Sequence, residues 1–581
     1  MLRRAIPLSI ALVAATTPAD SRARGQAPPA PPPPAAPVIT VPAGAAAVEQ
    51  TTHGTKPGAV LVESFDGLGV GFEGPQGTAT VRNPSDNSLA VGPDHIVQTV
   101  NQRTAIFTKK GNKYATTGKV LYGPVNTNIF FKGFGGSCEA RMSGDVVVRY
   151  DQVADRWLVV LPLFSRAAPR PDQPGEWKAG GGAYVSPPGV ANQPGPAAPL
   201  FQPPAPPPPP ADQPARGAQP PGGRGRGQEG PQGPYSMCYA ISTSPDPMGS
   251  YYRYEFLRPL FPDYPRPAIW SDGYYVPTST SDNRISETVA TQKHACVVDR
   301  AKMLKGEPAT EQCVIIENSN FLNNADVDGK KLPPAGAPNM MIAAGGTQLD
   351  KKFEDDGIFV WQFHVDWKDP ALTKITGPEK IAVAPYHYLC DGQLTFCVPQ
   401  PDSDKRLDAQ GDKIMARVVY RNVDGHESIV AVHSVNTAAG GGGVRWYELR
   451  VDKNRAASLY QQGTYAPEGF FRWMASPAID KLGNIGIGYS FGGSPNFAGQ
   501  RFAGRLAGDP KGQLTLKETV LVEGQAPEAG GRAPNQRWED YTQTAVDPSD
   551  DCTIWYVGDY VKKDATSYST RIGAFRMPGC R

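Results

Sequence analysis

Short runs of apolar, aromatic and β-branched residues recur along most of the chain from about residue 59 onward. Clusters of Gly, Asp, Asn and Lys separate these runs, as at Lys109–Asn112 and Asn422–Gly425. Such runs are typical of β-strands, and such clusters of turns. The expected strands include Ile96–Val100, Asp145–Tyr150, Gly357–Val365, Ile414–Tyr420 and Ser428–His433. Only Asp299–Leu304 has a pattern that predicts a helix, so the fold class is predicted to be all-β.

Three passages share one outline, in which an arginine is followed by a strand, a turn that begins with Asp, and a second strand. The arginines are Arg141, Arg472 and Arg537, and the turn residues are Asp151, Asp480 and Asp547. A hairpin that recurs every 45 to 65 residues or so predicts a β-propeller, whose blades recur at about 40–50 residues. The ordered length fits roughly six or seven blades. The C-terminal run Thr570–Phe575 is expected to complete a blade begun near the N-terminus, and the alternative fold is a pair of β-sandwiches.

The segments that lack the strand pattern predict export and disorder. Residues 1–27 have the order of a secretory signal peptide: two arginines, an apolar run and small residues. The apolar run is shorter than the roughly 20 residues that span a bilayer. Residues 28–58 are rich in Pro and Ala and predict a disordered tether. A second Pro/Gly-rich block, 167–234, predicts a disordered insertion in the propeller, which spans 59–581. We therefore expect a secreted or periplasmic protein.

Composition changes this picture little. The 581 residues include 63 Gly and 60 Pro, which favours many turns together with disordered segments. A net charge of +2 gives no field that attracts nucleic acid or an anionic membrane. The Arg-Gly run Gly222–Gln228 is interpreted as part of the solvated insertion. We expect no nucleic-acid partner and no transmembrane segment, and the sequence does not determine the oligomeric state.

Eight cysteines are candidates for disulfides in an exported protein. The sequence alone does not fix their connectivity. Pairing of near neighbours would join Cys296 to Cys313, Cys390 to Cys397 and Cys552 to Cys580, and would leave Cys138 with Cys238. No Cys-x-x-Cys motif is present, so a zinc site has no support.

Several passages resemble a family of uncharacterised secreted bacterial proteins with a sialidase-like β-propeller fold. They are Val91–Gln98, Asp151–Trp157, Ser244–Tyr254, Phe261–Pro265, Asp299–Leu304, Asp540–Tyr541 and Asp551–Trp555. Together they span about Leu89 to Tyr556, and the Pro/Gly-rich insertion departs from the family pattern. The resemblance implies the fold and no assigned activity. It also implies glycine in the relatives at the position of Glu539.

The three repeated arginines are the candidate ligand-binding residues. Sialidases bind a substrate carboxylate with three arginines, because a guanidinium offers two parallel donors to a carboxylate. If the strand that follows each arginine lines the central channel, Arg141, Arg472 and Arg537 could converge on an anion there. The alternative is that each forms a structural ion pair with a nearby acid; these acids are Glu139, Glu468, Glu539 and Asp540.

Two residues, Tyr541 and Glu539, are the catalytic candidates. Sialidases use a tyrosine nucleophile, and Tyr541 with Glu539 could take the roles of nucleophile and base, since two positions apart on a strand share a face. The alternative role of Tyr541 is packing within a blade. The sialidase motifs Ser-x-Asp-x-Gly-x-x-Trp and Phe/Tyr-Arg-Ile-Pro are absent.

Two further motifs partly match known functional motifs. Gly488-Tyr-Ser490-Phe-Gly492 matches the nucleophile elbow Gly-x-Ser-x-Gly, but no helix can follow it and no histidine follows His433. Asn324-Ala-Asp326-Val-Asp328 resembles the start of a calcium loop, but its twelfth position is Ala335 and not an acid. No cofactor is expected, and calcium binding in another geometry stays open.

A propeller outline without catalytic motifs predicts a binding or structural module, because a fold alone carries no activity. We expect it to recognise a glycan or an acidic ligand at the mouth of the channel. The alternatives are a sialidase-like glycoside hydrolase or lyase, and a cell-surface scaffold that binds other proteins.

Overall fold

The computed structural model describes residues 40–166, 184–185, 234–258, 261–278, 292–349, 353–392, 396–531 and 536–581. These residues belong to the unit Pro37–Arg581. The predicted signal peptide, the tether up to residue 39 and nearly all of the predicted insertion lie outside the described residues.

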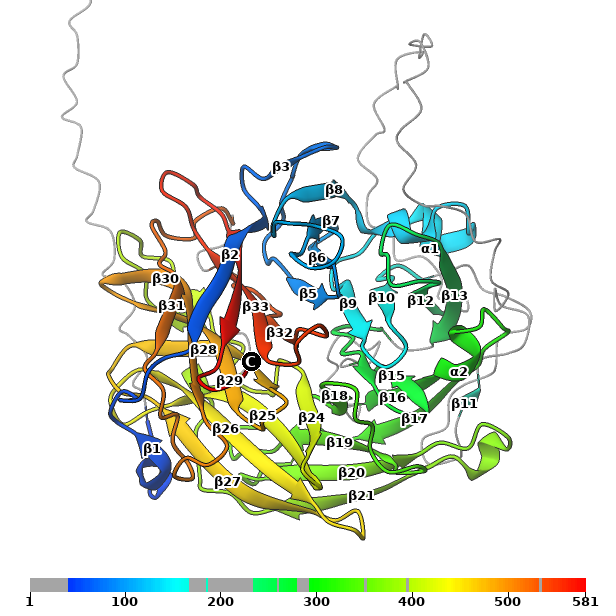
Figure 1. Ribbon diagram of the computed structural model, residues 1–581. Helices are drawn as coiled ribbons and strands as arrows, with labels where there is room; N and C mark the ends of the chain where they lie inside the picture. The colour runs from blue at the N-terminus through cyan, green and yellow to red at the C-terminus, as the bar shows by residue number, and fades with distance from the viewer. Residues whose placement is uncertain are drawn as a thin grey trace, which may run out of the picture. The chain divides into compact units, whose positions relative to one another are not determined.

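The strands confirm the all-β prediction, and they follow one another as antiparallel runs of four (Figure 1). One sheet holds β5 (Ser88–Val91), β6 (His95–Val100), β7 (Arg103–Thr108) and β8 (Val120–Asn126). The next holds β9 (Val147–Asp151), β10 (Arg156–Pro162), β12 (Tyr235–Ser242) and β13 (Tyr251–Arg258). A third holds β14 (Ala268–Ile269), β15 (Gly273–Tyr275), β16 (Gln292–Asp299) and β17 (Glu311–Glu317), with β11 (Tyr184–Val185) at its edge.

A larger sheet joins three such runs through parallel pairs of strands. The first run is β18 (Asn323–Val327), β19 (Asn339–Ala344), β20 (Ile358–His364) and β21 (Lys374–Ile381). The second is β24 (Val418–Val423), β25 (His426–Asn436), β26 (Gly442–Val451) and β27 (Ala457–Tyr465), which β1 (Glu49–Gln50) extends. The third is β28 (Phe471–Ile479), β29 (Ile485–Gly493), β30 (Asn496–Arg505) and β31 (Thr519–Val522). Parallel pairing of β18 with β24, and of β26 with β28, connects them.

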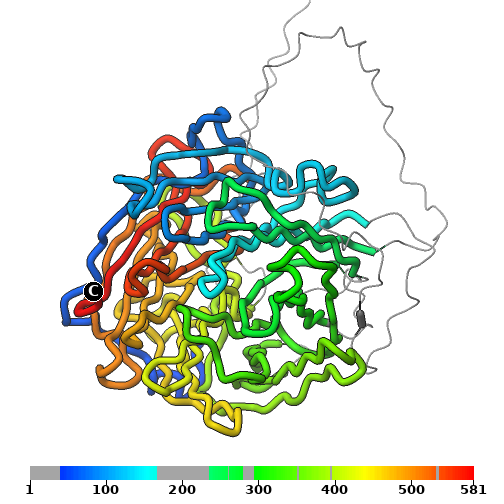
Figure 2. Tube along the Cα trace, turned by 45° about the vertical axis from the view of Figure 1, so that its right-hand side comes forward, coloured from blue at the N-terminus to red at the C-terminus, as the bar shows by residue number. Residues whose placement is uncertain are grey.

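The last sheet joins the two ends of the described chain. It holds β32 (Gln543–Val546), β33 (Thr553–Tyr560), β34 (Ser569–Arg576) and β2 (Val60–Gly69). The blue strand β2 pairs antiparallel with the red strand β34, and both figures show them side by side (Figures 1 and 2). This confirms the prediction that the C-terminal run completes a blade begun near the N-terminus.

The first strands of these runs line a common axis. In the order β14, β18, β24, β28, β32, β5 and β9, each contacts the next, and Arg149 of β9 donates a hydrogen bond to the carbonyl oxygen of Pro267 just before β14. The sheets therefore form a propeller-like ring (Figure 1). The remaining elements are short hairpins and helical turns: β3 (Glu73–Gly74), β4 (Gly77–Thr78), β22 (Phe396–Val398), β23 (Leu407–Asp408), α1 (Gly136–Ala140), α2 (Arg300–Met303), η1 (Ala45–Val48), η2 (Thr127–Phe131), η3 (Pro370–Leu372) and η4 (Leu389–Asp391).

Strand β10 shows why the sequence runs are apolar throughout instead of alternating. Trp157, Val159 and Leu161 pack into one core cluster, whereas Leu158 and Val160 pack into another. Successive side chains of a strand point to opposite faces, so a sheet between two neighbouring sheets buries both faces. The apolar run of β10 therefore reflects the packing of neighbouring sheets against both faces of its own sheet.

The three repeated hairpins also form as predicted. They pair β9 with β10, β28 with β29 and β32 with β33. In each turn the leading aspartate accepts backbone N–H bonds: Asp151 from Val153 and Ala154, Asp480 from Leu482 and Asn484, and Asp547 from Ser549. This is the Asx-turn geometry that makes aspartate favourable there. The short predicted helix is α2, capped by Asp299.

The three near-neighbour disulfides Cys296–Cys313, Cys390–Cys397 and Cys552–Cys580 form, and so does the remaining pair Cys138–Cys238. Such bonds are typical of proteins in oxidising compartments. Among the described residues no helix has the length and apolar character needed to cross a membrane.

Candidate functional site

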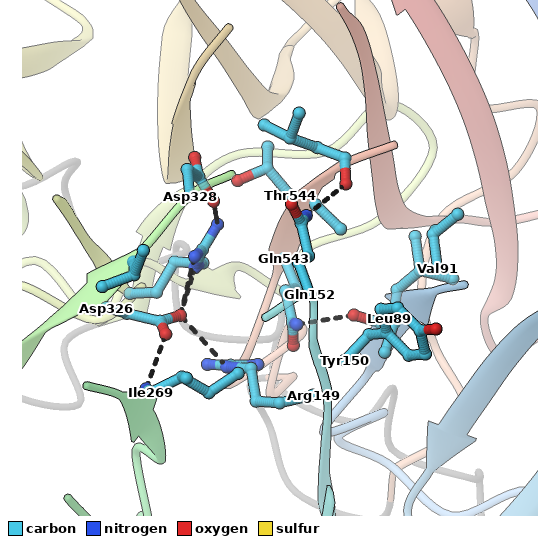
Figure 3. Close-up of a pocket in the computed structure, with 15 residues that line it drawn as sticks. Leu89, Val91, Arg149, Tyr150, Gln152, Ile269, Asp326, Asp328, Gln543 and Thr544 are labelled. Carbon is cyan, nitrogen blue, oxygen red and sulfur yellow. Dashed lines mark hydrogen bonds and ion pairs between the residues drawn. The ribbon is translucent and has the colours of Figure 1, made fainter. Parts of the chain in front are cut away.

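The axis of the ring is nearly filled by side chains. A cavity there is lined by parts of β5, β9, β14, β18 and β32 and by Arg417 (Figure 3). Its free volume of about 20 Å³ holds about one water molecule. This cavity therefore has no room for a sugar or a peptide.

Two arginines and two aspartates close the axis with balanced charge (Figure 3). Arg417 Nε lies 2.8 Å from Asp326 Oδ2, and Arg417 Nη1 lies 2.8 Å from Asp328 Oδ1. Arg149 Nε lies 3.5 Å from the same Asp326 oxygen. Burial lowers the pKa of Arg149 to about 10, so it is still charged at neutral pH. The two aspartates of the segment that resembles the start of a calcium loop thus bind arginine, and we interpret this network as scaffold.

A second group of polar residues lies where the inner strands begin. We call it the entrance cluster. Its members are Asp86, Asp145, Asp263, Tyr264, Asp408, Gln410, Lys413, Arg537, Asp540 and Tyr541. They come from the segments just before β5, β9, β14, β24 and β32. Because these strands surround one axis, segments far apart in the sequence meet at the same end of the ring.

The backbone holds several members in the left-handed region, which residues with a side chain rarely adopt. The φ angles are 48° at Asp86, 60° at Asp145, 49° at Tyr264, 46° at Gln410 and 67° at Asp540. Aspartate tolerates this region better than tyrosine or glutamine. Such conformations persist only where surrounding contacts enforce them, and they concentrate at functional sites.

Arg537 holds one half of the cluster together. Its guanidinium pairs with Asp540 and lies 3.1 Å from Asp408. Tyr264 donates its hydroxyl to Asp540 at 2.8 Å. Gln410 Nε2 donates to both aspartates at 3.1 Å. Three segments of the chain thus meet at one guanidinium, and the Arg537 side chain is still 33% exposed.

Asp145 organises the other half. Its Oδ2 accepts the Tyr541 hydroxyl at 3.0 Å and the Tyr264 backbone N–H at 3.2 Å. Asp86 Oδ2 accepts the backbone N–H of Asp145 at 3.3 Å. The other oxygen of Asp86 has no hydrogen-bond partner in the described part of the chain, although Asp86 is only 3% exposed. The cluster therefore contains a buried acceptor that its own residues leave unused.

Asp263 differs from the other carboxylates because it is partly exposed and no described side chain donates a hydrogen bond to it. Burial, and next the charge of Asp540, raise its pKa to about 6. The same two causes raise the pKa of Asp408 to about 6. Burial also raises the pKa of Asp86 and Asp145 well above the usual range, and neighbouring aspartates add to the shift. The cluster is thus short of positive charge.

The three predicted ligand arginines do not act together. Arg141 is exposed and donates to the carbonyl oxygens of residues 165 and 166. Arg472 is fully buried, with Glu518 at 2.9 Å and Glu468 at 2.7 Å. Only Arg537 belongs to the entrance cluster, and the three have no partner in common. The hypothesis that the three arginines converge on one anion is therefore wrong, because arginines at equivalent places in the three hairpins contact different neighbours.

Tyr541 and Glu539 also point to different neighbours. Tyr541 bonds to Asp145, whereas Glu539 Oε1 accepts Gln500 Nε2 at 2.9 Å and the Asp559 backbone N–H at 2.8 Å. Glu539 has a φ of 57°, and β32 begins only at Gln543. The expectation that the two share one face of a strand is therefore wrong. The left-handed backbone suits the glycine that the family resemblance implies at this position.

Glu539 allows a prediction on pH and stability. Burial, and next the charge of Asp559, raise the pKa of its carboxyl well above the ordinary value of 4.5. The protonated form is therefore favoured in the folded state, and its stabilisation is lost as pH rises through the raised pKa. Glu539→Gln keeps an acceptor for Gln500 and Asp559 without the charge. We expect the variant to gain on wild type by about 1.4 kcal/mol for each pH unit between the unfolded pKa and the raised folded pKa, and to keep that gain above it.

Urea unfolding at a series of pH values from about 5 to 8 measures this difference. Glu73→Gln, at an exposed acid in β3, is the matched control and should follow wild type at every pH. A constant difference between Glu539→Gln and wild type across that range would refute the buried charge.

The Gly-x-Ser-x-Gly motif has a packing role. Ser490 is buried in β29 and accepts hydrogen bonds from Trp538 Nε1 and Gln500 Nε2. A Cβ at Gly488 would lie 2.4 Å from the ring of Tyr556, so only glycine fits there. Strand β30 follows the motif, as the rejection of an elbow predicts.

Sequence reasoning missed the aspartates that dominate the cluster. Asp263 and Asp540 lie within passages that carry the family resemblance. Asp263 has no role in the sequence analysis, and Asp540 appears there only as an ion-pair partner of Arg537, a pair that the structure confirms. A usable signal existed, because Asp86, Asp145 and Asp540 each stand just before an inner strand. What the sequence lacked was the knowledge that those strand starts meet.

No family model and no curated protein matches the sequence. Solved structures with some likeness include a protein of unknown function from Dyadobacter fermentans, with a TM-score of 0.32, 9% identity, and coverage of 90% of this chain and 100% of that one. A mutant NanB sialidase from Streptococcus pneumoniae has a TM-score of 0.32 and 10% identity, over 70% of this chain and 65% of that one. An exo-β-1,3-galactanase from Clostridium thermocellum has a TM-score of 0.27 and 8% identity, over 89% and 97%. Scores this low support no argument about this chain.

Proposed function

We propose that this protein is an exported, seven-bladed propeller that binds a glycan at the entrance cluster. Seven successive runs of four strands support the blade count, and the disulfides support export. The axis itself is too full for a ligand. The binding function rests on the cluster alone.

One observation carries the proposal: Asp263 is a partly exposed carboxylate with no side-chain donor, beside Tyr264 and Arg537. A sugar hydroxyl can donate to Asp263 and accept from a free N–H of Arg537. Tyr264, which is partly buried, adds an aromatic ring beside these polar groups that a sugar ring could contact. Binding sites commonly combine one such apolar face with a few placed polar groups.

We expect Asp263→Asn to weaken glycan binding about tenfold or more. A hydrogen bond to a charged group contributes about 1.5–3 kcal/mol, and 1.4 kcal/mol corresponds to a factor of ten in affinity. A glycan array identifies the ligand, and calorimetry on wild type and variant measures the loss. No described side chain donates to Asp263, and its pKa is raised to about 6, so Asp263→Asn also removes an unfavourable charge and the unfolding midpoint at neutral pH should not fall.

Arg141→Ala is the matched control, since Arg141 is exposed and bonds only to two carbonyl oxygens. It should bind as wild type does. Wild-type affinity in Asp263→Asn would contradict the assigned site, and absence of any glycan ligand would contradict the function.

A glycoside hydrolase or lyase is the second candidate. The observation in its favour is that Asp263 and Asp408 both have a pKa of about 6. A carboxyl group with such a pKa can donate a proton near neutral pH, which glycoside hydrolysis requires. A panel of chromogenic glycosides run beside the array separates the two: turnover that Asp263→Asn abolishes would favour the enzyme.

A further inference from the structure

Carboxylates outnumber basic groups around the entrance. With its immediate neighbours Asp412, Arg266 and Lys293, the cluster holds six aspartates, Asp86, Asp145, Asp263, Asp408, Asp412 and Asp540, against Arg266, Lys293, Lys413 and Arg537. Lys413 pairs with Asp412 at 2.7 Å, and Arg537 pairs with Asp408 and Asp540. No described residue forms an ion pair with Asp86, Asp145 or Asp263.

The unused oxygen of Asp86 is a second, independent sign that a donor is missing. Asp86 is 3% exposed, and its Oδ1 has no hydrogen-bond partner among the described residues. The carboxylate lies against Asp145, whose backbone N–H it accepts. An unpaired buried carboxylate is costly unless it is protonated or meets a cation. A positively charged ligand group would remove this cost.

The spacing of the acids favours an organic cation over a metal ion. Calcium needs six to eight oxygen ligands around one point. Among the described residues, only Cys296, Glu311 and Cys313 form a close group of three potential ligands, and both cysteines are in one disulfide. An ammonium group needs fewer oxygen partners than calcium, because it donates only three hydrogen bonds, which can go to separate acceptors. Tyr264 can add a cation–π contact.

We infer that the glycan bound at the entrance carries a free amino group, as in oligomers of glucosamine, and is not an acidic glycan. The inference rests on the proposed glycan-binding function and reverses the charge expected from the three arginines. A ligand carboxylate would be repelled by Asp263 and Asp540, and the nearby guanidinium of Arg537 is already paired with aspartates. An ammonium would meet acids that have no counter-charge.

The test compares three oligosaccharides of equal length by calorimetry: a glucosamine oligomer, its N-acetylated form and an oligomer of glucuronic acid. The first two share ring and linkage and differ only at the nitrogen, where the acetyl group removes the positive charge and adds bulk. We expect the amine form to bind at least tenfold more tightly than the N-acetylated form, and its affinity to fall with added salt. Asp263→Asn and Asp86→Asn should each reduce this preference, and Arg141→Ala should retain it.

Equal or tighter binding of the N-acetylated or acidic oligomer would overturn the inference and leave the proposed function standing. Binding of none of these, and of no glycan on the array, would overturn both. Stoichiometric calcium binding that Asp263→Asn abolishes would show that the missing cation is a metal and would also overturn the inference.

Discussion

Replacing Cys138 and Cys238 together with alanine is expected to lower the free energy of unfolding by about 4.7 kcal/mol. The disulfide joins residues separated by 100 positions, and closing a longer loop removes more entropy from the unfolded chain. It ties α1 to β12, with both cysteines fully buried. Guanidinium unfolding followed by tryptophan fluorescence measures the loss.

The matched comparison is the double replacement of Cys390 and Cys397, which are separated by seven positions. By the same loop-entropy relation, this pair should lose only about 2.4 kcal/mol. Equal losses in the two variants, or a larger loss from the shorter loop, would contradict the loop-entropy account.

Arg472→Ala is expected to destabilise the fold by about 3–5 kcal/mol, because it breaks a buried ion pair and leaves charge without its partner. Arg472 is fully buried and lies between Glu468 and Glu518. Its guanidinium also lies over the rings of Tyr465 and Phe491. The same unfolding measurement applies, with ligand affinity as a second readout that should be unchanged in the folded variant.

Arg141→Ala again serves as the control. Arg141 occupies the equivalent place in the first repeat but is exposed, so its loss should change stability by no more than about 0.5 kcal/mol. A wild-type unfolding curve for Arg472→Ala would show that the buried pair contributes nothing, and would reopen a ligand role for this residue.

The fold was predictable because its signals are local. Aspartate followed by a four-residue turn recurs at Asp151, Asp480 and Asp547, and each turn closes a hairpin as expected. The short helix and the near-neighbour disulfides are local signals too. The pairing of β2 with β34 was predictable for another reason, since a ring of blades needs closure.

The sequence predicted only part of the candidate site: of the three predicted ligand arginines, Arg537 alone belongs to the entrance cluster. The same repeat gave Arg472, but this residue lies inside β28 and bonds to Glu518, beyond the end of β30. Arg537 precedes β32 and lies at the entrance, whereas Arg141 stands equally far before β9 and bonds to carbonyl oxygens outside the cluster. The repeat therefore fixes where each arginine stands along the chain, and the surrounding segments decide its partners.

The sequence by itself determined the strands, the turns and the repeated hairpin, because each depends on residues close together or on a repeated pattern. It favoured the ring and the disulfide pairs without fixing either. Only the tertiary structure decided where charge gathers. Asp86 and Glu539 are separated by 453 positions, yet the backbone N–H of Asp86 bonds to the carbonyl of Glu539. The raised pKa values of the cluster come from burial and from neighbouring acids, and neither is visible until inner strands from distant blades meet at one end of the axis.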